Sequence, residues 1–119
     1  MNRPYRGLTK DGKWIKGWFV SLYGFAYIVP EDAITLCGEA VIPETVGQYT
    51  SLTDIEKEDI YAGDKLETSN WGIVTVEWSE TKAMFGFWYK SNWGKSWCQL
   101  WKVQGFCKVI GNVHQEVKI

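Results

Sequence analysis

Residues 43–66 read PETVGQYTSLTDIEKEDIYAGDKL, and this stretch decides the fold of the chain. Its first half spaces single apolar residues among small and polar ones, as an extended segment does. The polar run 54–59 predicts a turn, and Ile60-Tyr61 then restores apolar β formers ahead of Gly63-Asp64. We therefore expect two strands joined by a turn, with the second strand leading into a further β-rich region.

The same residues resemble the YopX family of phage and prophage proteins. The resemblance lies in the Pro-Glu-Thr-Val-Gly-Gln-Tyr-Thr run at 43–50, in Ile-Tyr-x-Gly-Asp at 60–64 and in Val-Ile-Gly-Asn at 109–112. The start of the chain also matches, through Tyr5-Arg6-Gly7 and the Asp-Gly-Lys-Trp turn at 11–14. The resemblance therefore extends over nearly the whole chain and is most specific in 43–66.

One part of the chain departs from the family pattern. Glu56-Lys57 stand where relatives usually carry Asn-Gly, the pair that suits the positive φ of a tight turn. Either the turn type has changed or a short helical turn has replaced it. The motif Tyr61-x-Gly63-Asp64-x-Leu66 is similar to the start of small SH3-like barrels. The resemblance thus implies an all-β fold whose second half is an SH3-like small β-barrel.

At 119 residues the chain has the length of one domain, and its eight Trp, six Tyr and five Phe favour strands. We predict a single domain, 1–119, that is all-β with one short helix. The helix is expected at about 96–104, because aromatic and Leu residues recur there at helical spacing from Trp93 to Trp101. The three parts of the domain are N-terminal β hairpins at 1–42, a connector at 43–59 and the barrel half at 60–119.

The composition also predicts where the chain works. No apolar run approaches eighteen residues, so we expect no membrane span and no membrane partner. The first fourteen residues lack the apolar core of a signal peptide. Three cysteines without Cys-x-x-Cys spacing suit a reduced cytosol better than a disulfide framework. A cytoplasmic location follows, which the resemblance places in a bacterial host cell.

A formal net charge of −1 conceals segregated charges. Residues 1–30 are basic, 31–80 are strongly acidic, and 81–115 hold five lysines and no acid. One interpretation is that acidic and basic segments pair with each other, within the fold or between copies. The other is that a basic face receives an acidic partner.

The residues that could support catalysis or metal binding are few. Cys37, Cys98, Cys107 and His114 are the ligand types that zinc takes, but their spacing forms no knuckle and the cysteines have apolar neighbours. We expect core cysteines, a surface His114, and neither a zinc site nor a Cys107–His114 dyad. The acidic run 54–59 is expected to be solvated, whereas Asp64 should accept backbone N–H bonds. We predict no catalytic residue, no cofactor and no metal.

The best candidate for a binding surface is the segment 82–108, where lysines alternate with aromatic residues. Proteins that bind single-stranded nucleic acid combine cations with aromatic stacking platforms. On a strand, Trp88 and Lys90 would share the face opposite Phe87 and Tyr89. The alternative is that the Trp residues build the core, which we expect of Trp78 and Trp101 and leave open for Trp93. The candidate surface comprises Trp88, Lys90, Trp93, Lys95, Trp97 and Lys102.

These observations predict a non-catalytic protein, and two kinds of partner fit it. Many aromatic residues in a small domain leave apolar surface that a protein partner or a second copy covers. A phage accessory protein that serves protein interaction or self-assembly is therefore our first expectation. A module for single-stranded nucleic acid, using residues 82–108, is the alternative.

Overall fold

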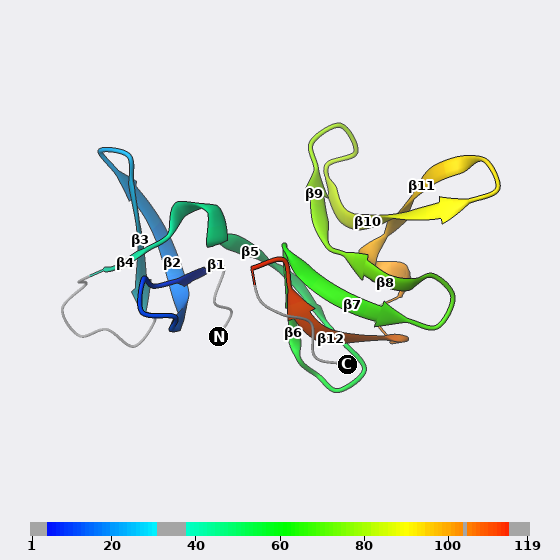
Figure 1. Ribbon diagram of the computed structural model, residues 1–119, viewed down its shortest axis with the longest axis horizontal. Helices are drawn as coiled ribbons and strands as arrows, with labels where there is room; N and C mark the ends of the chain where they lie inside the picture. Colours follow the sequence, from blue (N-terminus) through cyan, green and yellow to red (C-terminus); the bar gives the residue numbers. More distant parts are fainter. Residues whose placement is uncertain (1–4, 31–37, 104, 115–119) are drawn as a thin grey trace. The chain divides into compact units, whose positions relative to one another are not determined.

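The computed structural model describes residues 5–30, 38–103 and 105–114, and these form an all-β chain of antiparallel hairpins (Figure 1). Two compact units divide it, Met1–Tyr49 and Thr50–Ile119, and the division falls inside the predicted connector. Within the described residues, no helix is both long and apolar enough to cross a membrane.

The first unit is an antiparallel sheet with the strand order β4-β3-β2-β1-β5. Its strands are β1 (Tyr5–Leu8), β2 (Trp14–Leu22), β3 (Phe25–Pro30), β4 (Glu39–Val41) and the beginning of β5 (Gly47–Thr53). A single 3-10 turn, η1 (Pro43–Thr45), precedes β5, as the proline in this first turn predicts. Strand β5 continues into the second unit, where β6 (Asp59–Tyr61) is its neighbour.

One face of this sheet holds the core of the first unit. Ile15, Ala26, Ile28 and Val41 are buried there, because alternate residues of β2 and β3 point to the same side. Gly17 keeps unbroken register with both β1 and β3, so it is not a β-bulge. A Cβ atom at this position would lie 2.1 Å from the Val29 carbonyl oxygen, and this close approach is what requires glycine.

The second unit contains two three-stranded antiparallel sheets, ordered β11-β10-β9 and β12-β7-β8. Its further elements are β7 (Asp64–Thr68), β8 (Gly72–Thr75), β9 (Glu77–Ser79), β10 (Met84–Ser91), β11 (Gly94–Gln99), the 3-10 turn η2 (Leu100–Lys102) and β12 (Cys107–Asn112). The described residues form no closed barrel, so the all-β class is confirmed and the SH3-like barrel is not. Residues 72–79 form two strands, because the chain leaves the sheet at Val76, whose N–H donates to the Asp64 carbonyl and whose own carbonyl accepts from the Gly63 N–H.

The core of the second unit draws on both of its sheets. It includes fully buried Ile60, Leu66, Phe87 and Leu100, and Trp71 packs against its edge. Cys98 and Cys107 are buried in the same cluster as reduced thiols, as their apolar neighbours predicted. Cys37 lies outside the described residues.

The prediction of a short helix at 96–104 is wrong. Residues Gly94–Gln99 form β11, paired with β10 from Ser91↔Gly94 to Gly86↔Gln99, and only Leu100–Lys102 turn as a 3-10 helix. Gly94 at φ 99° ends a tight turn that returns the chain along β10. Pairing with β10 from Gly86 to Ser91 overrides the helical spacing of the aromatic residues.

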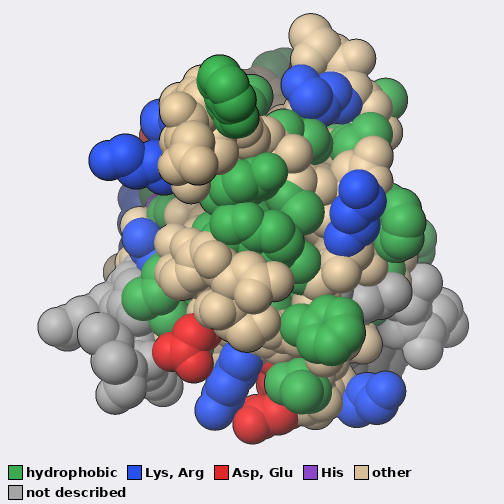
Figure 2. All heavy atoms as spheres, turned by 90° about the vertical axis from the view of Figure 1, so that its right-hand side faces the viewer, with side chains coloured by type: hydrophobic (Ala, Val, Ile, Leu, Met, Phe, Trp, Pro, Cys, Tyr) green, Lys and Arg blue, Asp and Glu red, His purple; other side chains and the backbone are tan. Residues whose placement is uncertain are grey.

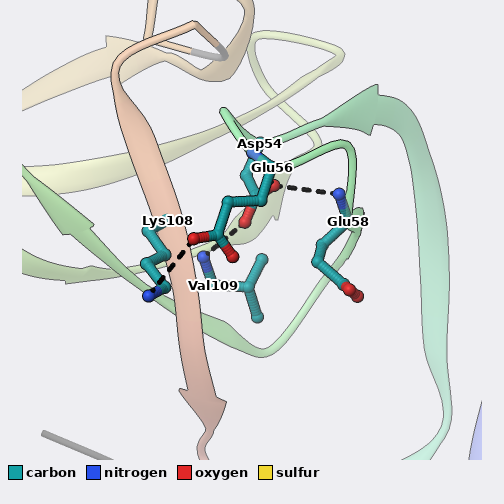
Figure 3. Close-up of polar contacts among 5 residues, drawn as sticks. All are labelled: Asp54, Glu56, Glu58, Lys108 and Val109. Atoms are coloured by element: carbon teal, nitrogen blue, oxygen red, sulfur yellow. Dashed lines mark hydrogen bonds and ion pairs between the residues drawn. The ribbon is translucent and has the colours of Figure 1, made fainter.

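The acidic turn after β5 also differs from expectation, because Asp54 is buried at 3% exposure. Its Oδ1 accepts the N–H groups of Glu56 and Glu58 at 2.8 and 2.9 Å, and its Oδ2 accepts that of Val109 at 2.9 Å (Figure 3). Lys57 takes the positive φ, 68°, that Asn or Gly would usually supply. The turn has therefore kept a tight geometry that is fixed by the Asp54 carboxylate.

Asp64 fulfils its prediction. It is fully buried, and its Oδ2 accepts the backbone N–H of Tyr61 at 2.8 Å. This bond closes the turn through Ala62 and Gly63, where Gly63 has φ 92°. The Ile-Tyr-x-Gly-Asp motif is thus a structural turn that sets the start of β7.

Candidate binding surface

The β10–β11 hairpin gathers most of the predicted surface on one face of its sheet. Trp88 lies directly opposite Trp97, and Lys90 lies directly opposite Lys95. Because residues two apart on a strand share a face, these four side chains project from the same side. The opposite side holds buried Phe87 and half-buried Tyr89, as the alternation predicted.

An indole pair lies at the centre of this face. The ring centroids of Trp88 and Trp97 are 5.2 Å apart and their planes meet at 69°, an edge-to-face arrangement. Gly86, next along β10 on this face, leaves room for the Trp97 ring, which a Cβ there would approach to 2.6 Å. The position of the indole pair is therefore set by the β10–β11 register and by the absence of a side chain at Gly86.

Lys82 completes the indole pair from the turn before β10. Its Nζ lies 5.4 Å from the centroid of Trp88 and 5.6 Å from that of Trp97, within the range of cation–π attraction. The sequence placed Lys82 in the basic segment but gave no signal for this position, because a turn residue has no strand alternation to orient it.

Lys102 and Trp97 both line an open groove of about 480 Å³ beside the hairpin, whose lining also includes Lys82 and Trp71. A second hollow, of about 310 Å³, adjoins Trp71 and Lys102 and reaches Phe106. The groove therefore brings Lys102 into the same surface as the indole pair, although Lys102 lies on η2 and not on the hairpin.

Trp93 lies at the tip of the β10–β11 turn and is 94% exposed, which answers the question left open by the sequence. The core positions predicted for Trp78 and Trp101 are wrong, since these residues are 48% and 60% exposed. The core instead takes its large residues from Phe87, Leu100 and the aliphatic residues of β7 and β8.

Charge on this side of the second unit is predominantly basic. Figure 2 views the side on which β10 and β11 lie in Figure 1, and shows hydrophobic side chains in the middle with lysines and arginines around them. Carboxylates are seen at its lower margin. In the part of the chain that the structure describes, Lys82, Lys90, Lys95 and Lys102 form no ion pair, while Lys108 pairs with Glu56 at 3.4 Å. Pairing between acidic and basic segments is thus realised at Lys108 and not along the hairpin.

The other chemically interesting residues do not assemble. His114 is exposed, as predicted. Across residues 5–30, 38–103 and 105–114, no three His, Cys, Asp or Glu side chains come close enough to hold a metal ion.

The buried thiols give a prediction about pH. Burial, and secondarily the nearby Asp54 carboxylate, raises the pKa of Cys107 to about 11. The unfolded chain loses this proton near the ordinary thiol pKa of about 8.5, whereas the folded chain keeps it. Stability should therefore fall as pH rises from about 9 to about 11. Urea unfolding across this range should show a shallower fall for Cys107→Ala than for the parent chain.

Cys98 provides the internal reference for this experiment. Burial raises its pKa also, so a Cys107→Ala protein should retain part of the alkaline loss. Equal slopes for the two proteins would show that the Cys107 thiol does not hold its proton in the folded state.

Comparison with known families gives one match. The family model described as YopX protein matches residues 26–119, which is most of the chain and includes the motifs at 43–50, 60–64 and 109–112. The resemblance at the start of the chain lies before the matched range. No curated protein matches the chain at a significant level.

Proposed function

Because the chain belongs to the YopX family, we propose that it is a phage or prophage accessory protein that acts by binding, without catalysis. Its place of action is the cytoplasm of the bacterial host. The observation that carries the proposal is the outer face of the β10–β11 hairpin, where the indole pair, with Trp88 41% exposed and Trp97 half-buried, lies among lysines that form no ion pair within the described residues. Such a face suits an acidic partner.

An acidic protein segment fits this face best. Carboxylates of the partner would reach Lys90, Lys95 and Lys102, while the apolar parts of the partner's acidic side chains would pack on the indoles. Lys82 already lies over Trp88 and Trp97, so a stacked base would have to displace it. We therefore place a protein partner first.

Single-stranded nucleic acid is the second candidate, and the exposed Trp93 favours it. Its ring is almost wholly free, and Lys95 is two residues away on the hairpin. Trp101 and Phe106, at 60% and 70% exposure, extend the aromatic path past Lys102. Free rings beside cations are the features that sequence-tolerant single-strand binders use.

The SH3-like barrel belongs to this proposal as its architectural part. Small barrels of this kind are common platforms for peptides and nucleic acids. An experimental structure in which the two sheets of the second unit close into one barrel would support it, and an open pair of sheets would reject it.

Two kinds of labelled probe separate the candidates: an oligoglutamate peptide, and single-stranded oligonucleotides of DNA and of RNA, each at low and high salt. Binding of the peptide that weakens with salt supports the protein partner. Oligonucleotide binding that quenches Trp fluorescence and falls steeply with salt supports the nucleic-acid module. If no probe binds at low salt, the hairpin is not a surface for acidic partners.

The double substitution Trp93→Ala with Lys95→Ala should weaken binding of the responding probe by about tenfold or more. Its melting temperature should stay within about 2 °C of the parent value, because Trp93 is almost fully exposed. Fluorescence anisotropy and a thermal melt measure the two quantities. Lys13→Ala, which removes one exposed lysine from the first unit, is the matched charge control and should bind normally. A large fall in melting temperature would show that Trp93 supports the fold.

A further inference from the structure

The β2–β3 hairpin carries a second exposed surface, on the face opposite the core of the first unit. Its register sets three apolar pairs side by side: Trp18 with Val29, Val20 with Tyr27, and Leu22 with Phe25. We call these six residues the outer ladder. Trp18, Val20, Leu22 and Phe25 are 54%, 42%, 53% and 64% exposed. The ladder is thus a continuous apolar strip that is open to solvent.

The hairpin has the composition of a sheet covered on both sides. Strands buried on both faces have apolar residues at successive positions, whereas a half-buried strand alternates apolar with polar. The sequences WFV at 18–20 and FAYIV at 25–29 are apolar on both faces. Ile28 and Ala26 are buried on the core face, while the described residues leave the outer ladder largely uncovered. This composition therefore indicates that the outer ladder is covered by something other than the described residues.

The charge pattern indicates what that cover is. From Gly17 to Pro30 the chain has no charged residue, so the ladder offers nothing that would select an acidic or basic partner. A surface that docks on its own copy must avoid like charges across the two-fold axis, and the ladder meets this condition. We propose that a second copy of this chain covers the outer ladder, which makes the protein a homodimer through β2 and β3.

The ends of the hairpin favour one orientation of the two copies. Lys16 and Arg6 are paired across β2 and β1 at the base of the same face. If the hairpins of the two copies run in opposite directions, the Leu22–Phe25 pair of each copy covers the Trp18–Val29 pair of the other. The positively charged ends of the two hairpins then stay apart. Two sheets packed in this way lie about 10 Å apart with nearly aligned strands.

Access to the ladder is provided by the length of the hairpin. The register of β1 along β2 ends at Gly17, and that of β4 along β3 covers Ala26 to Ile28. On its β2 side the hairpin therefore continues beyond β1, from Trp18 to Leu22, and Figure 1 shows β2 extending past β1. A second copy can reach the ladder without opening the sheet.

The size of the ladder sets the strength of the dimer. With side chains about half exposed, and aromatic residues that offer 150–250 Å² each, the ladder presents on the order of 400 Å² per copy. This is about half of the roughly 800 Å² per partner of a standard interface. The dimer should therefore be weak, with dissociation in the micromolar range or above.

Sedimentation velocity over a range from about 5 to 500 μM should show a monomer–dimer equilibrium for the full chain. Leu22→Lys places two charges in the apolar interface and should shift dissociation at least tenfold toward monomer. Val20→Thr keeps the β-branched shape and should shift it in the same direction by a smaller factor. Ser21→Lys is the matched control, because it adds the same charge to an exposed position on the other face of β2 and should leave dimerisation unchanged.

A parent chain that remains monomeric at the highest concentration would overturn the proposal, as would equal weakening by Leu22→Lys and Ser21→Lys. A monomer that binds anionic lipid vesicles through Leu22 would also overturn it, with a membrane as the cover. Circular dichroism confirms that each variant is folded. The proposal is independent of the β10–β11 hairpin, so monomeric Leu22→Lys should still bind whichever acidic probe the parent chain binds.

Discussion

Replacing Asp54 by Ala is expected to lower the free energy of unfolding by about 3 kcal/mol. The buried carboxylate accepts three backbone N–H groups, two within its own turn and one from Val109, which is 55 residues further along the chain. Hydrogen bonds to a charged acceptor each contribute about 1.5–3 kcal/mol, and water entering the emptied site recovers part of their sum. Urea unfolding followed by circular dichroism measures the loss.

Two companion variants make this result specific. Glu58→Ala removes an exposed carboxylate from the same turn while leaving its backbone in place, and should change stability by no more than about 0.5 kcal/mol. Asp54→Asn keeps the acceptor for Glu56 and Glu58 but turns an amide N–H₂ toward the Val109 donor, so it should lose stability too. An Asp54→Ala protein as stable as the parent would mean that the carboxylate does not tie β12 to the turn.

Replacing Gly86 by Ala should disrupt the β10–β11 hairpin and cost at least about 2 kcal/mol of stability. The new Cβ atom would lie 2.3 Å from the Cys98 carbonyl oxygen and 2.6 Å from the Trp97 ring. The ring can rotate away, but the carbonyl belongs to the strand paired with β10 and moves only if that pairing opens. Both the fold and the candidate binding surface should therefore suffer.

Circular dichroism provides a readout that is specific to the indole pair. Two indoles in contact give an exciton-coupled signal, and Gly86→Ala should reduce it together with the melting temperature. Gly105→Ala is the control, because no atom lies within 4 Å of its added Cβ, and both signals should persist. A Gly86→Ala protein that keeps the coupled signal and the parent melting temperature would contradict the close packing of Trp97 on Gly86.

Much of the local structure could be predicted from the chain alone. The pattern in 43–66 predicted two strands joined by a turn, which are β5 and β6, and hairpins were expected at 1–42, where β1, β2, β3 and β4 lie. Alternation also assigned Trp88 and Lys90 to the face opposite Phe87, because a strand has a two-residue period whatever its surroundings. The Asp64 turn could also be predicted from the chain alone, because the hydrogen bond from the Tyr61 N–H to the Asp64 carboxylate joins residues that are three apart in the sequence.

Other features depended on partners far along the chain. The aromatic spacing at 93–101 fits a helix as well as a strand, and only the pairing of β11 with β10 decides between them. Trp78 and Trp101 are large apolar residues of the kind that usually fill a core. The core is filled instead by Phe87, Leu100 and their neighbours, and both indoles are partly exposed. The hydrophobicity of a side chain does not determine which of several apolar residues the fold buries.

The sequence by itself determined the family, the all-β class, the turn motifs and the residue types of the hairpin surface, because these depend on local pattern. The tertiary structure alone decided that Asp54 is buried under β12, that Lys82 lies over the indole pair, and that the outer ladder is left exposed. Each of these depends on strand pairing between distant segments. Local periodicity orients a side chain relative to its own strand, whereas burial and charge contacts are set by what the rest of the fold places beside it.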